Sequence, residues 1–281
     1  MERLENVAVV GVGLIGGSIG MALLKRGLAT QVVGIGRRQV SLRTARRMEA
    51  VTNTTIDISK GVAKADLVIV CTPVGQIVDH VRQVAKSCPK GTLITDCGST
   101  KQSITEELDG KLPRECRFLG SHPLAGSEKG GPANATADLF EGRVAIITPT
   151  KNTKAEDFDL LDDFWSGIGS VVIKMTAEQH DQAVATTSHL PHMVASALAG
   201  TVPEEFYRIS GTGLRDSTRI AGGDPKLWKQ IFSLNRENIL KVLKQYELNL
   251  SAFRNALSAN DQEELERLLT VAKKNRDALG S

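Results

Sequence analysis

Aromatic residues are scarce in this chain of 281 residues, because phenylalanine, tryptophan and tyrosine together make up only 4% of it. So few rings cannot form the stacking surface that binds single-stranded nucleic acid. The net charge is only +3, with the basic residues scattered, so we expect no nucleic-acid partner. No apolar run approaches the ~18 uncharged residues that a membrane span needs, and the charged start does not resemble a signal peptide. We therefore expect a cytoplasmic protein that does not bind a membrane.

Cysteines are also few, and none of the four forms a Cys-x-x-Cys pair. A disulfide framework is therefore not expected. His189 and His192 lie three residues apart, but no H-E-x-x-H pattern or cysteine ligand accompanies them, so we expect no metal site. Hydrophobic residues make up 41% and charged residues 24%, which is typical of a globular protein. The length is about twice that of the ~100–150-residue modal domain, which suggests two domains.

Short apolar runs alternate with helical patterns as far as residue 174. This order predicts a parallel sheet with helices on both faces, the doubly wound α/β arrangement of Rossmann-type folds. We expect the helix after the first strand to end at a left-handed Gly27. The predicted strands are residues 7–10, 31–35, 67–71, 92–95, 117–119, 144–148 and 171–173.

Helical periodicity replaces the strand pattern from Thr176 onward. The main predicted helices are 227–257 and 261–279, and the residue pairs Thr176/Gln179 and Asp224/Pro225 have the spacing of helix starts. We expect a dinucleotide-binding domain over 1–174 and an all-helical dimerisation and substrate domain over 175–281. The apolar stripes of so small a helical half favour packing against a second copy, as a homodimer.

The run Gly11-Val12-Gly13-Leu14-Ile15-Gly16 follows the first predicted strand and opens a helix. Gly11 permits a tight turn, Gly13 lets a pyrophosphate approach the backbone, and Gly16 lets the helix lie close to the sheet. The helix start at Leu14 and Ile15 supplies free N–H groups and a favourable dipole. These residues predict a dinucleotide site; the alternative is an ordinary strand–helix turn.

The residue that follows the second strand is Gly36, where NAD-binding folds usually carry an acidic residue. Arg37 and Arg38 come next, and a guanidinium can grip a 2′-phosphate with two hydrogen bonds. We therefore expect NADP rather than NAD; the alternative is that both arginines only begin a solvated helix. Thr72 and Pro73 follow the third strand and are expected near the cofactor, unless they form a simple loop.

Ser99 and His122 are the candidate catalytic residues, because each follows a predicted strand and so lies at the carboxyl edge of the sheet. A neutral imidazole there can accept a hydroxyl proton at physiological pH. The alternatives are a capping box from Ser99 to Gln102 and a structural histidine. The glycine-rich segment after His122 contains Ser127 and Glu128, which we expect to contact substrate.

The helical half offers three further candidates for binding an anionic substrate. One of His189 and His192 is expected to bond the substrate while the other packs inside the fold, and the sequence does not say which. Arg219 is a candidate carboxylate clamp, because its guanidinium fork matches the two oxygens. An ion pair with Asp216, three residues earlier, is the alternative.

These runs together resemble the prephenate/arogenate dehydrogenase family of tyrosine biosynthesis, in the family's order and with its two-domain layout. The resemblance implies a nucleotide-binding domain followed by a helical dimerisation domain, in the minimal form without a chorismate mutase segment or a regulatory domain. The matching runs are GVGLIGGS at 11–18, VCTP at 70–73, DCGSTK at 96–101, SHPLAG at 121–126, HD at 180–181, SHLPH at 188–192, and DSTR at 216–219 with Asp224-Pro225 after it.

The resemblance also implies roles for single residues. His122 corresponds to the catalytic histidine that bonds the ring 4-hydroxyl, and Ser99 to the serine that shares this bond beside the nicotinamide. Arg219 corresponds to the arginine that holds a substrate carboxylate, and His192 to the substrate-side histidine. Trp228 corresponds to a tryptophan that reaches the site from the other subunit. Glu128 lies where the family often has a gating or specificity residue.

The implied reaction is the oxidative decarboxylation of prephenate to 4-hydroxyphenylpyruvate. The alternative substrate is arogenate, which carries an amino group in place of the keto group. A β-hydroxyacid dehydrogenase would rely on a lysine in the helical half, and the sequence singles none out. A non-enzymatic NADP-sensing protein would need none of Ser99, His122, His192 and Arg219.

Overall fold

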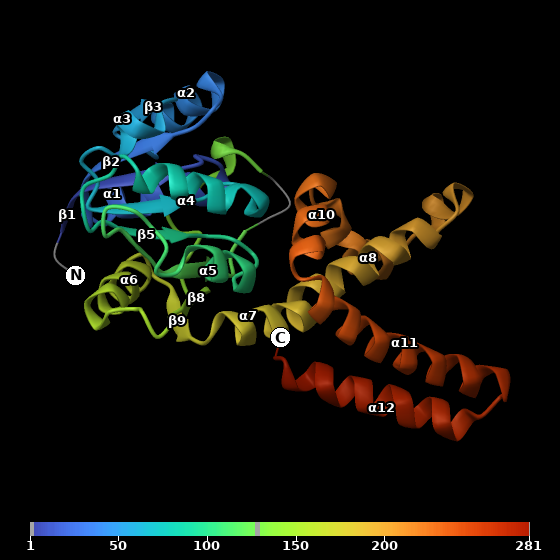
Figure 1. The fold of residues 1–281 in the computed structure, drawn as a ribbon. Helices are drawn as coiled ribbons and strands as arrows, with labels where there is room; N and C mark the ends of the chain where they lie inside the picture. Colours follow the sequence, from blue (N-terminus) through green and yellow to red (C-terminus); the bar gives the residue numbers. More distant parts are fainter. Residues whose placement is uncertain (1–2, 127–129, 281) are drawn as a thin grey trace. The chain divides into compact units, whose positions relative to one another are not determined.

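The computed structural model describes residues 3–126 and 130–280 and divides into two compact units, residues 1–235 and 236–281. The first unit contains both sheets and the helices as far as residue 234 (Figure 1). None of the helices in the described part of the chain is long and apolar enough to cross a membrane.

A six-stranded parallel sheet forms the centre of the first unit, which confirms the predicted doubly wound arrangement. The short β3 was not predicted, because its polar sequence Asn-Thr-Thr at the sheet edge lacks an apolar strand pattern. The order is β3-β2-β1-β4-β5-β6, and the strands are β1 (Leu4–Val10), β2 (Ala29–Ile35), β3 (Asn53–Thr55), β4 (Leu67–Val70), β5 (Leu93–Asp96) and β6 (Arg117–Phe118).

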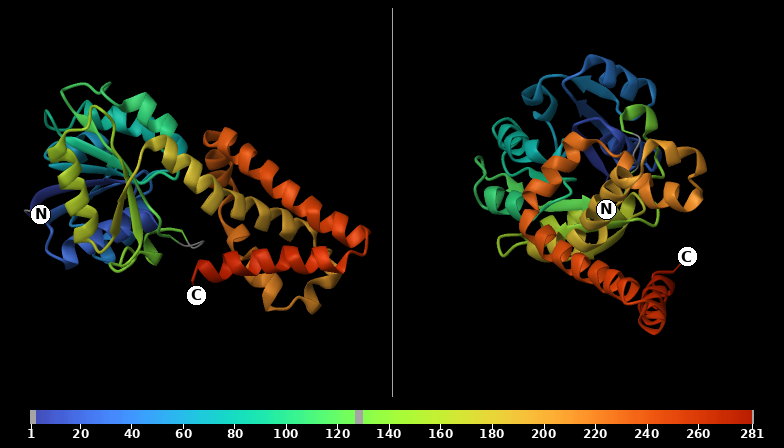
Figure 2. Two further views of the ribbon diagram at one scale, coloured as in Figure 1. Left: turned by 90° about the horizontal axis from the view of Figure 1, so that it is seen from below. Right: turned by 90° about the vertical axis from the view of Figure 1, so that its right-hand side faces the viewer.

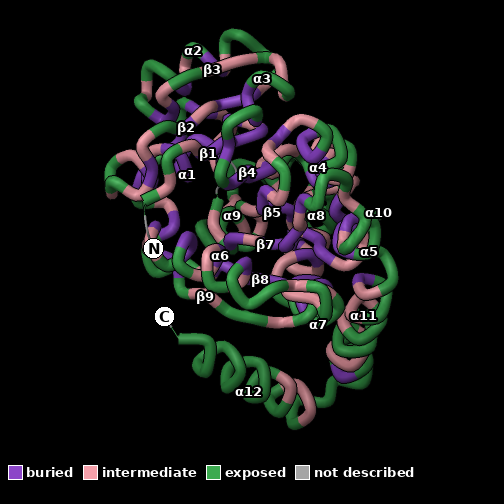
Figure 3. Tube along the Cα trace, turned by 60° about the vertical axis from the view of Figure 1, so that its left-hand side comes forward, coloured by how far each residue is buried: buried purple, intermediate pink, exposed green. Residues whose placement is uncertain are grey.

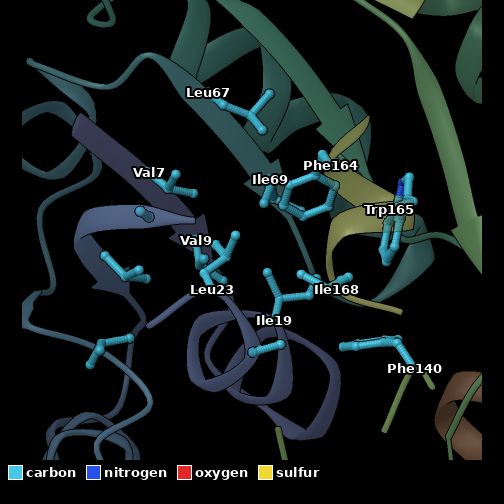
Figure 4. Close-up of a cluster of buried hydrophobic side chains, with 14 of the residues drawn as sticks. Val7, Val9, Ile19, Leu23, Leu67, Ile69, Phe140, Phe164, Trp165 and Ile168 are labelled. Atoms are coloured by element: carbon cyan, nitrogen blue, oxygen red, sulfur yellow. The ribbon is translucent and has the colours of Figure 1, made fainter. Parts of the chain in front are cut away.

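Alternate residues of β1 enter two different hydrophobic clusters, one on each face of the sheet. Val7 and Val9 pack with α1 (Leu14–Lys25), α2 (Gln39–Arg47) and α6 (Ala155–Gly167), as Figure 4 shows for part of this cluster. Ala8 and Val10 pack with α3 (Ile58–Val62), α4 (Ile77–Ala85) and α5 (Gln102–Leu108). Burial of each large apolar side chain stabilises the fold by about 1.5–3 kcal/mol, so both faces anchor the strands firmly.

A second sheet of three strands was not predicted. It has the order β7-β8-β9, formed by β7 (Gly120–Pro123), β8 (Val144–Thr148) and β9 (Val171–Lys174), with β7 antiparallel to β8. The assignment of 144–148 and 171–173 to the parallel sheet was therefore wrong. His122 follows β6, as predicted, and itself lies within β7. Strand periodicity shows that a segment is extended and does not show which partner it pairs with.

The helical part of the first unit begins with the predicted capping box, in which Thr176 and Gln179 bond each other's backbone N–H groups. Asp224 accepts a bond from the Lys226 N–H, as its position before Pro225 predicted. Gly27 is left-handed, with φ of 66°. The elements are η1 (Val74–Gln76), η2 (Pro132–Asn134), α7 (Ala177–Val184), the π-helical turn η3 (Ala185–His189), α8 (Leu190–Thr201), η4 (Glu204–Ile209), α9 (Thr212–Thr218), η5 (Arg219–Gly222) and α10 (Pro225–Leu234).

The predicted helix over 227–257 is divided in two at Asn235. This residue is buried, and its side-chain amide donates to the Asp181 carbonyl at 2.7 Å, which fixes it outside the helical pattern. An apolar periodicity cannot reveal such a break, because both helices have the same period.

The second unit is a pair of helices, α11 (Arg236–Ser258) and α12 (Gln262–Ala278), which contact each other and run in opposite directions in Figures 1 and 2. Most of α12 is exposed (Figure 3). Several large apolar side chains of this unit are also exposed, namely Leu240, Leu248, Leu250, Leu257, Leu269 and Val271. The domain boundary near residue 175 stays a prediction.

Candidate active site

A cavity of about 290 Å³ lies where β1, β2 and β4 end at the carboxyl edge of the parallel sheet. Its lining includes Gly11 and Gly13 from the glycine turn, Arg37 and Arg38 after β2, and, after β4, the pair Thr72-Pro73. Six of the ten residues predicted to bind cofactor line this cavity. The remaining ones form the first turn of α1 or, in the case of Ser99, follow β5. Those remaining residues are Leu14, Ile15, Gly16 and Ser99.

The three glycines of the turn differ in their surroundings. Gly11 has φ of 98°, and an added Cβ would lie 2.7 Å from the Cys71 carbonyl oxygen. At Gly16 an added Cβ would lie only 2.2 Å from the Gly11 carbonyl oxygen. Gly13, in contrast, has no described atom within 4 Å of such a Cβ, and no side chain caps the start of α1 there. The open backbone at a helix start fits the pyrophosphate of a dinucleotide.

The part of the cavity lining that follows β2 is basic. Arg37 and Arg38 both line it, and no acidic side chain is among the described lining residues. His80 also lines it, and its Nδ1 lies 3.0 Å from the Thr72 hydroxyl. Burial and the nearby Arg37 lower the pKa of His80, so the imidazole is neutral at pH 7. These side chains could hold the ribose and its phosphate.

A chain of contacts leads from this cavity to His122. The sulfur of Cys71, which lines the cavity, lies 3.5 Å from that of Cys97, the residue after β5. The last residue of β5, Asp96, accepts a 2.7 Å bond through its carbonyl from the Ser121 hydroxyl. Ser121 precedes His122 in β7, so the imidazole lies beside the carboxyl edge of the parallel sheet, as predicted.

His122, which is half-buried, belongs to a hydrogen-bonded chain of three side chains. Its Nδ1 lies 2.8 Å from His180 Nε2, and His180 Nδ1 lies 2.7 Å from Asp181 Oδ1. His180 and Asp181 are both buried, and the two imidazole planes are 66° apart. The sequence indicated this pair only as one of the runs shared with the family, because nothing local connects α7 with β7.

Asp181 also determines how α5 begins. Its Oδ1 accepts the Lys101 N–H at 2.8 Å and its Oδ2 accepts the Gln102 N–H at 3.0 Å. No side chain of the local segment caps this helix. The capping box predicted from Ser99 to Gln102 was therefore wrong, because a carboxylate 80 residues further along the chain satisfies the same N–H groups.

A buried ion pair supports the loop that carries Ser99. Lys101 Nζ bonds Asp96 Oδ2, and both side chains are 0% exposed. Asp96 also accepts backbone N–H bonds from Gly98 and Ser121. These bonds join the loop after β5 to β7, so they restrain the segments that carry Ser99 and His122 relative to each other.

The surroundings of His122 make its imidazole neutral. Burial holds the pKa of His122 well below its ordinary 6.5, and the neighbouring His180, Lys101 and His189 act in the same direction. Burial also lowers the pKa of His180, although the adjacent Asp181 opposes the shift. A neutral imidazole at pH 7 has an unprotonated ring nitrogen, which is what a general base requires.

The two histidines of the helical part differ in their surroundings. His189 is buried, its Nδ1 lies 3.1 Å from Asn235 Nδ2, and burial lowers its pKa to about 4. His192 is stacked on Trp228 with the ring centroids 3.5 Å apart, and its buried Nδ1 has no partner among the described residues. His189 is therefore hydrogen-bonded inside the fold, whereas His192 Nδ1 makes no such bond with the described residues.

Arg219 is exposed at the start of η5, and this segment packs against α8, the helix that carries His192. Gly223 follows η5, and a Cβ there would lie 2.5 Å from Trp228 Nε1 and 3.1 Å from His192 Cε1. The chain thus brings its own Trp228 to its own His192. The carboxylate role of Arg219, its convergence with His122, and a contribution of Trp228 to the other subunit stay predictions. Ser127 and Glu128 lie outside the described residues.

The site therefore has the parts of a dehydrogenase that uses a nicotinamide cofactor: a glycine turn with a dinucleotide cavity, and a neutral histidine at the same edge of the sheet. In residues 3–126 and 130–280 no cluster of three or more His, Cys, Asp or Glu side chains could hold a metal ion.

Comparison with known proteins identifies the family. Residues 19–174 match the nucleotide-binding domain of prephenate dehydrogenase, and residues 176–271 match its dimerization domain. The chain is 34% identical over 286 residues to the cyclohexadienyl dehydrogenase of Zymomonas mobilis, covering 99% of this chain and 97% of that one. It therefore belongs to the prephenate dehydrogenase family and is an oxidoreductase.

Two solved structures share the fold over the whole chain. Prephenate dehydrogenase from A. aeolicus, in complex with hydroxyphenyl propionate and NAD+, has a TM-score of 0.90 and 31% identity, covering 98% of each chain. The arogenate dehydrogenase of Synechocystis has a TM-score of 0.79 and 29% identity, covering 98% of this chain and 99% of that one.

Proposed function

We propose that this enzyme converts prephenate to 4-hydroxyphenylpyruvate by oxidative decarboxylation, with NADP as the preferred cofactor. The observation that carries the proposal is the neutral His122 beside the edge of the sheet that forms the dinucleotide cavity. The complex of the A. aeolicus relative with hydroxyphenyl propionate, whose hydroxyphenyl group resembles that of the product, supports the substrate class. Arogenate is the second candidate, because the Synechocystis relative is an arogenate dehydrogenase.

His122 removes the proton of the substrate ring hydroxyl. The nicotinamide cofactor, held by the glycine turn and the basic cavity, supplies the hydride acceptor. Loss of carbon dioxide from the opposite ring carbon then makes the ring aromatic, so the step runs strongly downhill. The enzyme's principal task is to hold the substrate in a reactive orientation. Proton removal by His122 contributes about 10²–10⁴-fold to the rate.

Side chains of the helical part hold the substrate in this proposal. Arg219 binds a substrate carboxylate with its guanidinium, and His192 offers its unpartnered Nδ1 to the substrate. Trp228 supports the His192 ring by stacking. Ser99 shares the bond to the ring hydroxyl from the loop after β5. Ser127 and Glu128 remain proposed substrate contacts.

The preference for NADP rests on Arg37 and Arg38, which line the cavity without an acidic neighbour among the described lining residues. A carboxylate at this place would repel a 2′-phosphate, whereas a guanidinium binds it with two charge-assisted hydrogen bonds. The A. aeolicus relative was crystallised with NAD+, so the two enzymes differ in cofactor under this proposal.

We also propose a homodimer. The match of residues 176–271 to a dimerization domain and the exposed leucines of α11 and α12 both support it. Light scattering after size-exclusion chromatography should give twice the chain mass of 30.2 kDa.

Steady-state kinetics with both substrates and both cofactors test the function. We expect the highest kcat/KM with prephenate and NADP. Turnover of arogenate alone would replace the substrate assignment, and a clear preference for NAD would end the cofactor assignment. If the enzyme turned over neither substrate, the alternative of a nucleotide-sensing protein would be favoured.

A further inference from the structure

We propose that His180 and Asp181 are positioning residues that determine which ring nitrogen of His122 is available as the base. The inference deepens the proposed function, because it concerns the proton that the substrate hydroxyl loses. It rests on the hydrogen-bonded chain His122–His180–Asp181 and on the backbone bonds that hold Asp181 in place.

The argument begins at Asp181. Its carboxylate accepts two backbone N–H bonds from the start of α5, so both oxygens are already acting as acceptors. The group that lies 2.7 Å from Oδ1, His180 Nδ1, must therefore be a donor and carry a proton. The reverse arrangement would need a protonated carboxyl group opposite two backbone donors.

The protonation of His180 then determines that of His122. A neutral imidazole with a proton on Nδ1 has none on Nε2, so His180 Nε2 accepts. His122 Nδ1 lies 2.8 Å away and is therefore the donor. Since burial lowers the pKa of both rings, each carries one proton at pH 7. His122 Nε2 is then unprotonated and available to accept the substrate proton.

The same chain stabilises the charge that forms during the reaction. When His122 takes a proton it becomes an imidazolium, which its buried surroundings disfavour. The negative charge of Asp181, transmitted through the polarised ring of His180, offsets part of this cost. Among residues 3–126 and 130–280, the other ionisable groups that act on His122 are Lys101 from the loop before α5 and His189 from η3, which both disfavour its charged form. Asp96 of β5 pairs with Lys101.

The hydrogen-bonded chain can fix the proton of His122 only if its three side chains are held in place. His180 is 0% and Asp181 2% exposed, and the Asp181 carbonyl accepts a bond from Asn235. Asp181 is therefore fixed by bonds to its side-chain carboxylate and to its backbone carbonyl. His122 joins the hydrogen-bonded chain from β7, a strand of the second sheet.

Nitrogen-15 NMR of the ring nitrogens tests the assignment directly. The protein contains only five histidines, so protein labelled at histidine can be assigned by single substitutions. We expect His122 in the wild-type enzyme to carry its proton on Nδ1 at pH 7.5. A proton on Nε2 would overturn the proposal, and this result does not depend on which substrate the enzyme uses.

Substitutions of His180 test the consequence. His180→Phe removes both bonds and should lower kcat by about 10²-fold or more, within the ~10²–10⁴-fold that a general base supplies. It should also remove the preference of His122 for the Nδ1 proton and shift the pH profile of kcat. His180→Gln places an acceptor near the lost Nε2, so it should recover at least about tenfold of kcat relative to His180→Phe. Gln182→Ala, an exposed change on the same helix, is the matched control and should leave kcat unchanged.

A kcat for His180→Phe within about threefold of the wild type, with an unchanged pH profile, would refute the proposal. Equal losses in His180→Phe and His180→Gln would also refute it, because they would indicate a packing role alone. If His180→Phe does not fold, the wild-type NMR spectrum and the His180→Gln pH profile still decide the matter. If the wild type turns over neither substrate, the proposed function fails while the NMR result still tests the chain.

Discussion

Replacing Lys101 by methionine should destabilise the protein strongly. The Lys101→Met substitution keeps most of the side-chain volume but leaves the Asp96 carboxylate, which is 0% exposed, without its cation. An uncompensated buried charge costs about 3–5 kcal/mol, whereas total domain stability is about 5–15 kcal/mol. The backbone N–H groups of Gly98 and Ser121 still bond Asp96, so the loss should fall towards the lower end of that range.

Urea unfolding followed by circular dichroism measures this loss. One protein concentration is used throughout, because the stability of the proposed dimer would depend on concentration. The matched control is Lys154→Met, whose ion pair with Glu156 is mostly exposed, and which should cost less than about 1 kcal/mol. Adding Asp96→Asn to Lys101→Met removes the stranded charge and should recover part of the stability. A loss below about 1 kcal/mol for Lys101→Met would refute the reasoning, since it would mean that water or another group compensates Asp96.

Three further predictions follow from the site. His122→Asn should keep cofactor binding, measured by fluorescence titration, and lose about 10²–10⁴-fold in kcat; an unimpaired variant would remove the base assignment. Arg219→Ala should chiefly raise KM for prephenate, and an unchanged KM would argue against the carboxylate clamp. Stability should fall as pH drops from 6.5 towards 4, because the unfolded chain binds a proton that buried His189, with its pKa of about 4, rejects. His189→Gln should reduce this fall in the free energy of unfolding by up to about 3 kcal/mol, measured by urea titrations between pH 6.5 and 4. The same dependence on pH in the variant and the wild type would contradict the assignment to His189.

The local parts of the fold could be predicted from the sequence because they depend on neighbouring residues. The turn from Gly11 to Gly16, the capping box at Thr176 and the left-handed Gly27 are all decided within a few positions, and each was confirmed. The apolar strands of the central sheet were predicted for the same reason, since burial on both faces leaves continuous apolar runs.

The parts that were missed depend on contacts between distant segments. Nothing near Ser121 or His122 shows that β7 leaves the parallel sheet to pair with β8. The Ser99 to Gln102 spacing predicted a local cap, yet Asp181 takes its place from α7. The role of His180 and Asp181 likewise depends on the fold, which brings α7 next to His122. The local sequence shows only that two polar residues are adjacent.

The carboxylate of Asp181 has a consequence for any attempt to produce the nucleotide-binding half by itself. A fragment that stops at residue 174 would lack the acceptor for the Lys101 and Gln102 N–H groups, at a penalty of about 0.5–2 kcal/mol for a missing helix cap. Its α5 would fray at the end nearest Ser99. Truncation would thus disorder the loop that carries Ser99 while leaving the glycine turn intact. Such a fragment would keep its affinity for a dinucleotide better than it kept the order of this loop.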